Sequence, residues 1–258
     1  MKDRRGYLGI FYVIFLVVFV VLPLLVVGYY AFTNSEGRFT VENFTEFFTN
    51  GKMLGTFVYS LAIAFCTTAL ALLIAYPTAY VLVRKNIKKS GVLVTLLVLP
   101  MWINFTLRIT AMKEILSTIE GNLAYYPFFN TVLCQVYDFL PFMILPIYTC
   151  IEDIDWGYIE AARDLGARKR MAFVKVLLPL SMPGIASGIT MVFLPAMTNY
   201  VVLDMIYNST YIMGSLIGSY FAAFDWHRGS MVSIILLLFI LLASYTKTRA
   251  QRAESEVA

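Results

Sequence analysis

The sequence predicts an all-α membrane protein that crosses the bilayer six times. Of its 258 residues, 60% are hydrophobic and 14% are charged, and the mean hydropathy is +0.75. Soluble globular domains carry about 25% charged residues, so this composition indicates a polytopic membrane protein. The second observation is a series of six apolar runs, each near the roughly 20 residues that a helix needs to cross a bilayer core. The runs lie near residues 8–32, 54–83, 92–111, 128–151, 181–203 and 229–246.

The first run, 8–32, is too long for the apolar region of a secretory signal peptide, and no small-residue cleavage pattern follows it. We therefore expect it to remain as a membrane anchor, with Pro23 in its middle. The segment 33–52 alternates aromatic and acidic residues, which predicts a short helix at the membrane interface. Prolines inside several later runs predict that some of those helices are tilted or broken.

The basic residues predict the orientation. Fifteen of the 20 Lys and Arg residues lie in the two termini and in the segments 84–91 and 152–178. Because cytoplasmic loops are enriched in Lys and Arg, these four regions are predicted to be cytoplasmic. Both termini then share one side of the membrane, which agrees with an even number of spans. The net charge of +4 is thus explained by topology, and no nucleic-acid partner is expected.

We expect one transmembrane domain over residues 1–258, because no internal repeat, low-complexity tract or long linker divides the chain. Cys66, Cys134 and Cys150 are widely spaced in or beside apolar runs, so we interpret them as small apolar fillers rather than disulfide partners or metal ligands. His227 is the single histidine. We place it at a boundary between a loop and an apolar run, since nothing nearby completes a metal shell.

A polar stretch stands out among the apolar runs: residues 155–184 read DWGYIEAARDLGARKRMAFVKVLLPLSMPG. Asp155 can cap a short helix, and Gly166 suits the left-handed turn that ends one. The apolar residues between them recur at i, i+3, i+4 and i+7, which places them on one face of a helix. These residues are Tyr158, Ala161, Ala162 and Leu165.

Beyond Gly166 the pattern predicts a second helix that ends at Pro179 and is followed by a Pro183–Gly184 turn before the next apolar run. Helix, glycine and helix together predict a rigid elbow beside the bilayer. From this pattern alone, two interpretations remain open. The elbow is either a docking site for a partner or a surface segment that binds nothing.

The same stretch resembles the EAA motif of the inner-membrane permeases of ABC importers, EAA-x3-G-x9-I-x-L-P. The matching residues are Glu160, Ala161, Ala162, Gly166, Val176 in place of isoleucine, Leu178 and Pro179. The resemblance implies a type I ABC importer permease fold, in which the segment 155–179 is a coupling helix that inserts into a groove of a cytoplasmic ATPase subunit. It assigns the coupling role to Glu160, Ala161, Ala162, Arg163, Leu165, Gly166 and Pro179.

The resemblance also implies the partners. They are a homologous second permease subunit, a cytoplasmic ATPase dimer, an extracytoplasmic substrate-binding protein and the lipid of a bacterial inner membrane. The sequence contains no G-x-x-x-x-G-K-[ST] phosphate loop, so ATP and Mg are expected on the ATPase and no cofactor on this chain. An intramembrane hydrolase is disfavoured because G-x-S-x-G and H-E-x-x-H motifs are also missing from the sequence. We predict a transporter subunit rather than an enzyme.

Four runs, at 99–111, 140–167, 194–208 and 224–238, resemble the spermidine/putrescine permease subfamily, and specifically the first of its two paired subunits. A polyamine carries two to four ammonium groups on a methylene chain. A path for it should offer carboxylates and aromatic faces. The candidate path residues are Asp138, Asp204, Trp102, Asn104, Arg108 and Tyr200.

Each of these candidates has a competing interpretation. Asp138 either faces the path, or satisfies a helix break at Pro141, or pairs with Arg108. Asp204 is either a path residue or an ordinary charge at the end of a span, and Trp102 either lines the path or belongs to an aromatic belt. Arg108 repels a polyamine, so we expect it to pair with a carboxylate. It would contact the cargo if that cargo were sulfate or a ferric complex instead.

Three acidic residues lie outside the predicted spans and are candidates for contact with a substrate-delivering protein. They are Glu114, Glu120 and Asp225.

Overall fold

The computed structural model describes residues 3–84, 90–206 and 211–257, and these ranges are helical apart from short connections and one isolated β-bridge between Thr33 and Phe39. The chain forms two compact units. The first contains Met1–Phe57 and Met213–Ala243, and the second contains Val58–Ile212 and Ser244–Ala258.

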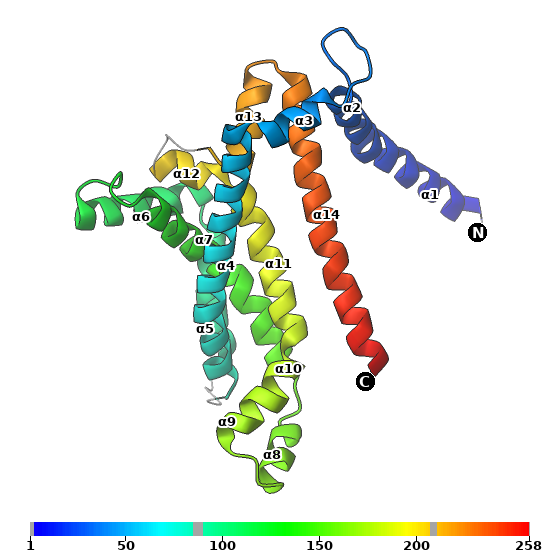
Figure 1. The fold of residues 1–258 in the computed structure, drawn as a ribbon. Helices are drawn as coiled ribbons and strands as arrows, with labels where there is room; N and C mark the ends of the chain where they lie inside the picture. Colours follow the sequence, from blue (N-terminus) through cyan, green and yellow to red (C-terminus); the bar gives the residue numbers. More distant parts are fainter. Residues whose placement is uncertain (1–2, 85–89, 207–210, 258) are drawn as a thin grey trace. The chain divides into compact units, whose positions relative to one another are not determined.

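Figure 1 shows the helices in chain order. The longer ones are α1 (Asp3–Leu16), α2 (Leu22–Ala31), α4 (Gly51–Arg84), α5 (Ser90–Val98), α6 (Phe105–Glu120), α7 (Pro127–Glu152), α11 (Met182–Thr198), α13 (Met213–Ala222) and α14 (Trp226–Val257). The shorter ones are α3 (Glu42–Thr49), α8 (Gly157–Asp164), α9 (Lys169–Ala172), α10 (Leu178–Leu180) and α12 (Tyr200–Ile206). A π-helical turn at Val17–Val21 joins α1 to α2, and another at Phe173–Leu177 joins α9 to α10.

Both π-helical turns precede a proline. Pro23 is the second residue of α2, and Pro179 is the second residue of α10. A proline ring clashes with the carbonyl four residues earlier and offers no N–H to it. The wider π-turn relieves that conflict, so the helix continues past the proline instead of ending there. The first predicted run is accordingly a continuous apolar stretch from Ile10 to Ala31.

Within the first unit, polar contacts hold α2, α3 and the start of α14 together. The side-chain amide of Asn43 donates to the carbonyls of Ala31 and Thr33 at 3.0 and 3.1 Å. Arg228 donates to both carboxylate oxygens of Glu46, at 3.1 and 2.7 Å. His227 lies in the first turn of α14, where its Nδ1 is 3.0 Å from the carbonyl oxygen of Tyr30. The helix predicted within 33–52 is α3.

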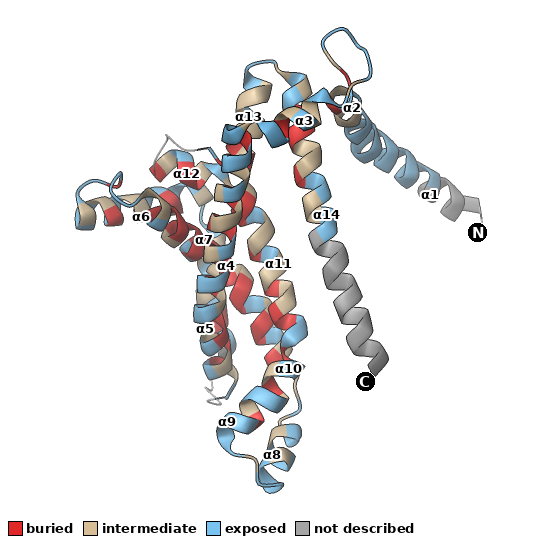
Figure 2. Ribbon diagram, in the orientation of Figure 1, coloured by how far each residue is buried: buried red, intermediate tan, exposed pale blue. Residues whose placement is uncertain are grey.

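The core of the second unit lies along α7, which packs side by side with α11 (Figure 1). Figure 2 shows buried residues gathered on α7. Glycines of α11 permit this approach. A Cβ added at Gly184 would lie 2.5 Å from Cβ of Cys150 and 2.7 Å from the carbonyl oxygen of Pro146, and one at Gly188 would lie 2.7 Å from Sδ of Met143. Small residues are the usual means of close helix packing in membranes.

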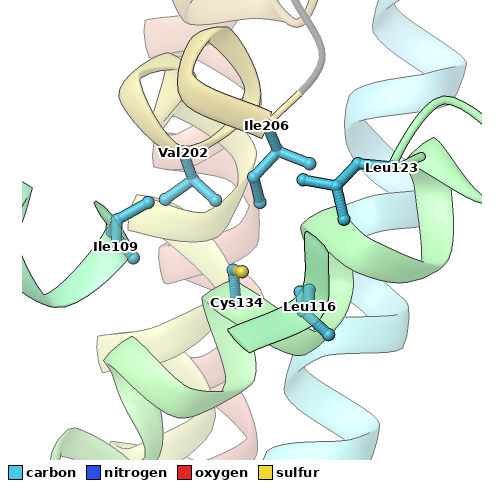
Figure 3. Packing of buried hydrophobic residues seen from close by; sticks show 6 residues of the cluster. All are labelled: Ile109, Leu116, Leu123, Cys134, Val202 and Ile206. Carbon is cyan, nitrogen blue, oxygen red and sulfur yellow. The ribbon is translucent and has the colours of Figure 1, made fainter. Parts of the chain in front are cut away.

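A hydrophobic cluster joins α6 and α12 to α7 (Figure 3). Its buried members are Ile109, Leu116, Leu123, Cys134, Val202 and Ile206. Cys134 is fully buried among these side chains, which confirms its role as an apolar filler. All three cysteines are free thiols.

Two predicted spans are not continuous helices. The run 92–111 is broken at Ile103–Asn104, and the helical stretches on either side make an angle of 96°. The Asn104 side chain accepts from the amides of Thr106 and Leu107 at 2.9 and 3.4 Å. It therefore starts a new helix, α6, in a new direction. The run 181–203 is broken at Asn199, between α11 and α12.

The predicted Pro183–Gly184 turn is wrong. Both residues lie in the first turn of α11, where proline is well tolerated because its missing N–H needs no partner. The chain turns instead at Ser181, with a bend of 61° between Lys169–Leu180 and Met182–Thr198. Pro141 likewise does not interrupt α7, which runs unbroken to Glu152.

By length and composition, three helical stretches of the described chain can each cross a membrane: Ile10–Ala31, Gly51–Arg84 and Pro127–Glu152. The two bent pairs raise this number to five if each is one span. A shorter apolar stretch lies at Trp226–Leu242.

Candidate functional site

The predicted elbow is present in the second unit, at α8. The Asp155 carboxylate accepts from the amide of Gly157, the first residue of the helix, at 2.9 Å. The N-cap position is Trp156, without a side-chain cap bond, so Asp155 lies one residue before the cap that the sequence predicted. At the other end Gly166 has φ of +87°. Its amide donates to the carbonyl of Arg163 at 2.9 Å, and the next amide, of Ala167, donates to Ala162 at 3.0 Å. These two bonds form a Schellman motif, whose left-handed residue is best supplied by glycine.

The two sides of α8 differ in exposure. Leu165 is 90% exposed and Tyr158 is 61% exposed, and Ala161 between them is exposed as well. Ala162, which we expected on the same stripe, is half-buried. The uncovered apolar surface is therefore Tyr158, Ala161 and Leu165, which we call the docking face. Its centre is a methyl group, so another protein surface can approach closely.

Charged groups surround the elbow beside the docking face. A hollow of about 700 Å³ lies there. It is lined by Glu160, Arg163, Asp164, Gly166, Ala167, Arg168 and Lys169. The hollow thus offers both carboxylates and cations to the charged groups of a partner.

The N-cap residue of α8, Trp156, is linked to α4 and to the π-helical turn by aromatic rings. The ring of Trp156 lies 6.5 Å from that of Tyr80, and Tyr80 lies 5.7 Å from Phe173. Phe173 lies 5.8 Å from Tyr76. The hydroxyl of Tyr76 in turn lies 3.0 Å from Oγ of Ser181, both buried. A continuous chain of contacts therefore runs from α8 to the bend where α11 begins.

Sequence reasoning missed this aromatic chain and one further polar link. Thr67 donates to Oε1 of Gln135 at 3.1 Å, and the Gln135 amide donates to the carbonyl of Ala196 at 3.3 Å. Gln135 therefore connects α4, α7 and α11 inside the core. In the sequence, Gln135 is a polar amide within an apolar run. Because buried polar groups in membranes need partners, this position could have been predicted to form such a link.

Among the predicted path residues, the structure brings Arg108 and Asp138 together. Nη2 of Arg108 on α6 lies 2.6 Å from Oδ1 of Asp138 on α7, with only 7% and 4% of the side chains exposed. This is the carboxylate partner predicted for Arg108. Nε and Nη1 of Arg108 have no hydrogen-bond partner within the described chain. The two charges neutralise each other, so Asp138 carries little net charge toward a cargo.

The other path candidates are all exposed. Trp102 is 86% exposed in the short turn before α6, and Asn104 is used as the cap of that helix. Tyr200 begins α12 and Asp204 lies on its exposed side. A path role for each of these residues stays a prediction.

The acidic residues outside the predicted spans take different roles. Glu120 accepts from the side-chain amide of Asn130 at 2.8 Å, and Asp225 pairs with Arg228 at 3.3 Å within the first unit. Glu114 is exposed on α6.

Two comparisons of the sequence identify related proteins. Residues 4–250 match the family described as the binding-protein-dependent transport system inner membrane component. The chain is 36% identical to the spermidine/putrescine transport system permease protein PotB of Haemophilus influenzae, across 92% of this chain and 90% of that one. It is 33% identical to PotB of Escherichia coli K12, across 92% of this chain and 94% of that one.

Solved structures show the same fold. A bacterial ABC transporter that imports the acidic polysaccharide alginate matches with a TM-score of 0.68 at 16% identity, across 96% of each chain. The MetNI methionine ABC transporter matches with a TM-score of 0.59 at 20% identity, across 79% of this chain and 98% of that one. The described helices thus have the type I ABC importer permease fold. This chain belongs to the family of multi-pass inner-membrane components of binding-protein-dependent transport systems.

Proposed function

We propose that the chain is one permease subunit of an ATP-driven importer for polyamines such as spermidine and putrescine. The observation that carries the coupling part is the docking face of α8, which ends at the glycine elbow. Two of its three residues, Ala161 and Leu165, lie within the EAA motif. The cargo is supported by the PotB relatives, which are named for spermidine and putrescine and are 33–36% identical over most of this chain.

In this proposal the membrane is crossed six times. The passages are the three long helices, the predicted runs 92–111 and 181–203, which overlap the two bent pairs, and the stretch Trp226–Leu242. Both termini and α8 face the cytoplasm, as the distribution of basic residues favours. The complex contains a homologous second permease, an ATPase dimer that binds ATP and Mg, and an extracytoplasmic binding protein. Glu160, Ala161, Arg163 and Leu165 meet the ATPase.

Movement passes from the ATPase to the spans through the contacts behind α8. When the ATPase subunits close, α8 is displaced and carries Trp156 with it. The rings of Tyr80 and Phe173 pass that displacement to Tyr76. The hydroxyl of Tyr76 then acts on Ser181 at the bend before α11. Gly166 and Pro179 set the geometry of the elbow and of its junction with α11.

A cationic cargo needs carboxylates and aromatic faces. Because Arg108 neutralises Asp138, Asp204 is the exposed carboxylate among the candidates. Tyr200 lies on the same short helix, and Trp102 and Asn104 lie at the exposed break before α6. We assign these four residues to the path, with Asp138 available when its pairing with Arg108 opens.

An anionic cargo such as sulfate, or a ferric complex, is the second candidate. It is favoured by Nε and Nη1 of Arg108, two buried donors without partners in the described chain. An anion on these donors would satisfy them, whereas a polyamine would be repelled.

The test is uptake by the complete transporter reconstituted in vesicles. Labelled spermidine should enter only with ATP and the binding protein, and putrescine should compete with it while sulfate and ferric ion do not. Competition by sulfate or ferric ion alone would favour the second candidate. Uptake without ATP would contradict an ATP-driven importer.

A further inference from the structure

A second hollow lies where α8 meets the end of α4, and it shares Glu160 and Arg163 with the hollow beside the docking face. This crevice has a volume of about 400 Å³, within the roughly 300–1,000 Å³ of small-molecule sites. Its lining is Val83, Arg84, Trp156, Ile159, Glu160 and Arg163. All six residues belong to the second unit.

The crevice combines cations with apolar walls. Arg84 and Arg163 line it together with one acid, Glu160. A narrower extension beside it is lined by both arginines and Lys169, with no acidic residue among the described residues that form it. Within the described chain, neither arginine has a carboxylate at ion-pair distance. The guanidinium of Arg84 instead contacts the Tyr80 ring, 5.5 Å from its centre, and donates to the Tyr80 hydroxyl. Such a site favours an anion, and guanidinium groups bind phosphate especially well.

An exposed apolar stripe on α4 leads directly to the crevice. Leu73 is 71% exposed and Val81 is 40% exposed, and Pro77 between them is exposed as well. These residues follow one another at intervals of four, so they share one face of the helix with Arg84, three residues beyond Val81. A phosphate bound at Arg84 therefore has an uncovered apolar surface running away from it along the helix.

We propose that the crevice binds the headgroup of an anionic phospholipid, with its acyl chain along Leu73, Pro77 and Val81. Arg84 holds the phosphate, and Trp156 lies at headgroup depth, where tryptophan is enriched in membrane proteins. Free phosphate satisfies the same cations but gains nothing from the apolar stripe or from the Val83 and Ile159 walls. The inference rests on the membrane placement of α4 and α8 in the proposed function. The bound lipid would then steady the back of α8 while its docking face engages a partner.

The experiment measures lipid binding to the assembled transporter in detergent by native mass spectrometry. The probes are phosphatidylglycerol, phosphatidylcholine and inorganic phosphate. Phosphatidylglycerol should bind in preference to the other two. Arg84→Gln should weaken its binding about fivefold, the effect of one basic side chain at an anionic surface. Arg84→Lys should retain most of the binding because it keeps the charge.

The matched control is Arg170→Gln, which removes an exposed charge from the same polar segment outside the crevice. An equal loss in this control would show diffuse attraction and overturn the proposal. Equal binding of phosphatidylcholine, or binding of phosphate with no preference for the lipid, would overturn it as well. A further test replaces Val83 with a photoreactive residue. If that residue cross-links to an ATPase subunit and not to lipid, the crevice is a protein contact and the proposal is overturned.

Failure of this inference is distinguishable from failure of the proposed function. A cysteine at Leu165 labelled only from the extracytoplasmic side of sealed cells would refute the proposed function, whatever lipid binds. Normal spermidine uptake and cytoplasmic labelling, combined with no lipid preference, would refute the crevice alone.

Discussion

Arg108 and Asp138 form a buried ion pair between α6 and α7, with Nη2 and Oδ1 only 2.6 Å apart. Removing one partner of such a pair leaves an uncompensated buried charge, which costs about 3–5 kcal/mol in proteins. We therefore predict that Asp138→Asn lowers the stability of the purified permease, measured as thermal unfolding in detergent. The exchange of Arg108→Asp with Asp138→Arg should recover part of the loss. If Asp138→Asn raised the KM for spermidine with no change in stability, the side chain would belong to the path and not to the packing.

Gly166 is predicted to be irreplaceable by a branched residue. Its φ of +87° is a left-handed conformation that costs other residues about 1–2 kcal/mol, and β-branched residues more. Gly166→Val should abolish spermidine uptake while membrane insertion stays normal, because the elbow and not the spans is deformed. The matched control is Gly91→Val, at an exposed position with open space around it. Normal uptake in Gly166→Val would remove the elbow from the mechanism.

The docking face should tolerate a charge structurally but not functionally. Leu165→Glu places a carboxylate on a side chain that is 90% exposed, so the fold should be unaffected. Co-purification with the ATPase should weaken by about tenfold or more, as expected for a large apolar residue that is buried in an interface. Met171→Glu is the control, since Met171 is exposed on α9 outside the docking face. An equal loss in both variants would indicate a general effect of negative charge.

The hydrogen bond between Tyr76 and Ser181 should affect coupling more than stability. Tyr76→Phe removes one hydroxyl from a neutral bond, a loss of about 1 kcal/mol. We predict more ATP hydrolysed for each spermidine imported, measured by assaying both rates on the same vesicles. Ser181→Ala should reproduce the effect. Tyr137→Phe, on a more exposed tyrosine of α7, should leave the ratio unchanged. An unchanged ratio in Tyr76→Phe would show that the displacement of α8 travels by another route.

Local patterns predicted the elements whose signals are local. The run 128–151 matches α7, at Pro127–Glu152, to within one residue at each end. Gly166 marked the end of α8 because a left-handed turn favours glycine, whereas Asp155 lies one residue before the N-cap position, Trp156. Breaks at prolines were expected in general, but the break in 92–111 was not located because hydropathy remains high across it, although Pro100 and Asn104 carried the signal of a helix end and a new cap.

Contacts between distant residues could not be predicted in this way. Thr67 and Gln135 are 68 positions apart, and Tyr76 and Ser181 are 105 apart. The local sequence around each residue does not indicate its partner, because these pairs form only when α4, α7 and α11 pack together. The Arg108–Asp138 pair was foreseen as one of several alternatives only because two opposite charges in apolar surroundings have few other ways to be satisfied.

The glycines of α11 have a consequence for how a pathway can open. Gly184 and Gly188 of α11 lie in close contact with Cys150, Pro146 and Met143 of α7. If α11 slid along α7 by less than the rise of one residue, its atoms would clash with these residues. We therefore expect α7 and α11 to move together as one rigid unit. In the proposed transport cycle, bending is then expected at the two flanking interruptions, at Ser181 before α11 and at Asn199 after it.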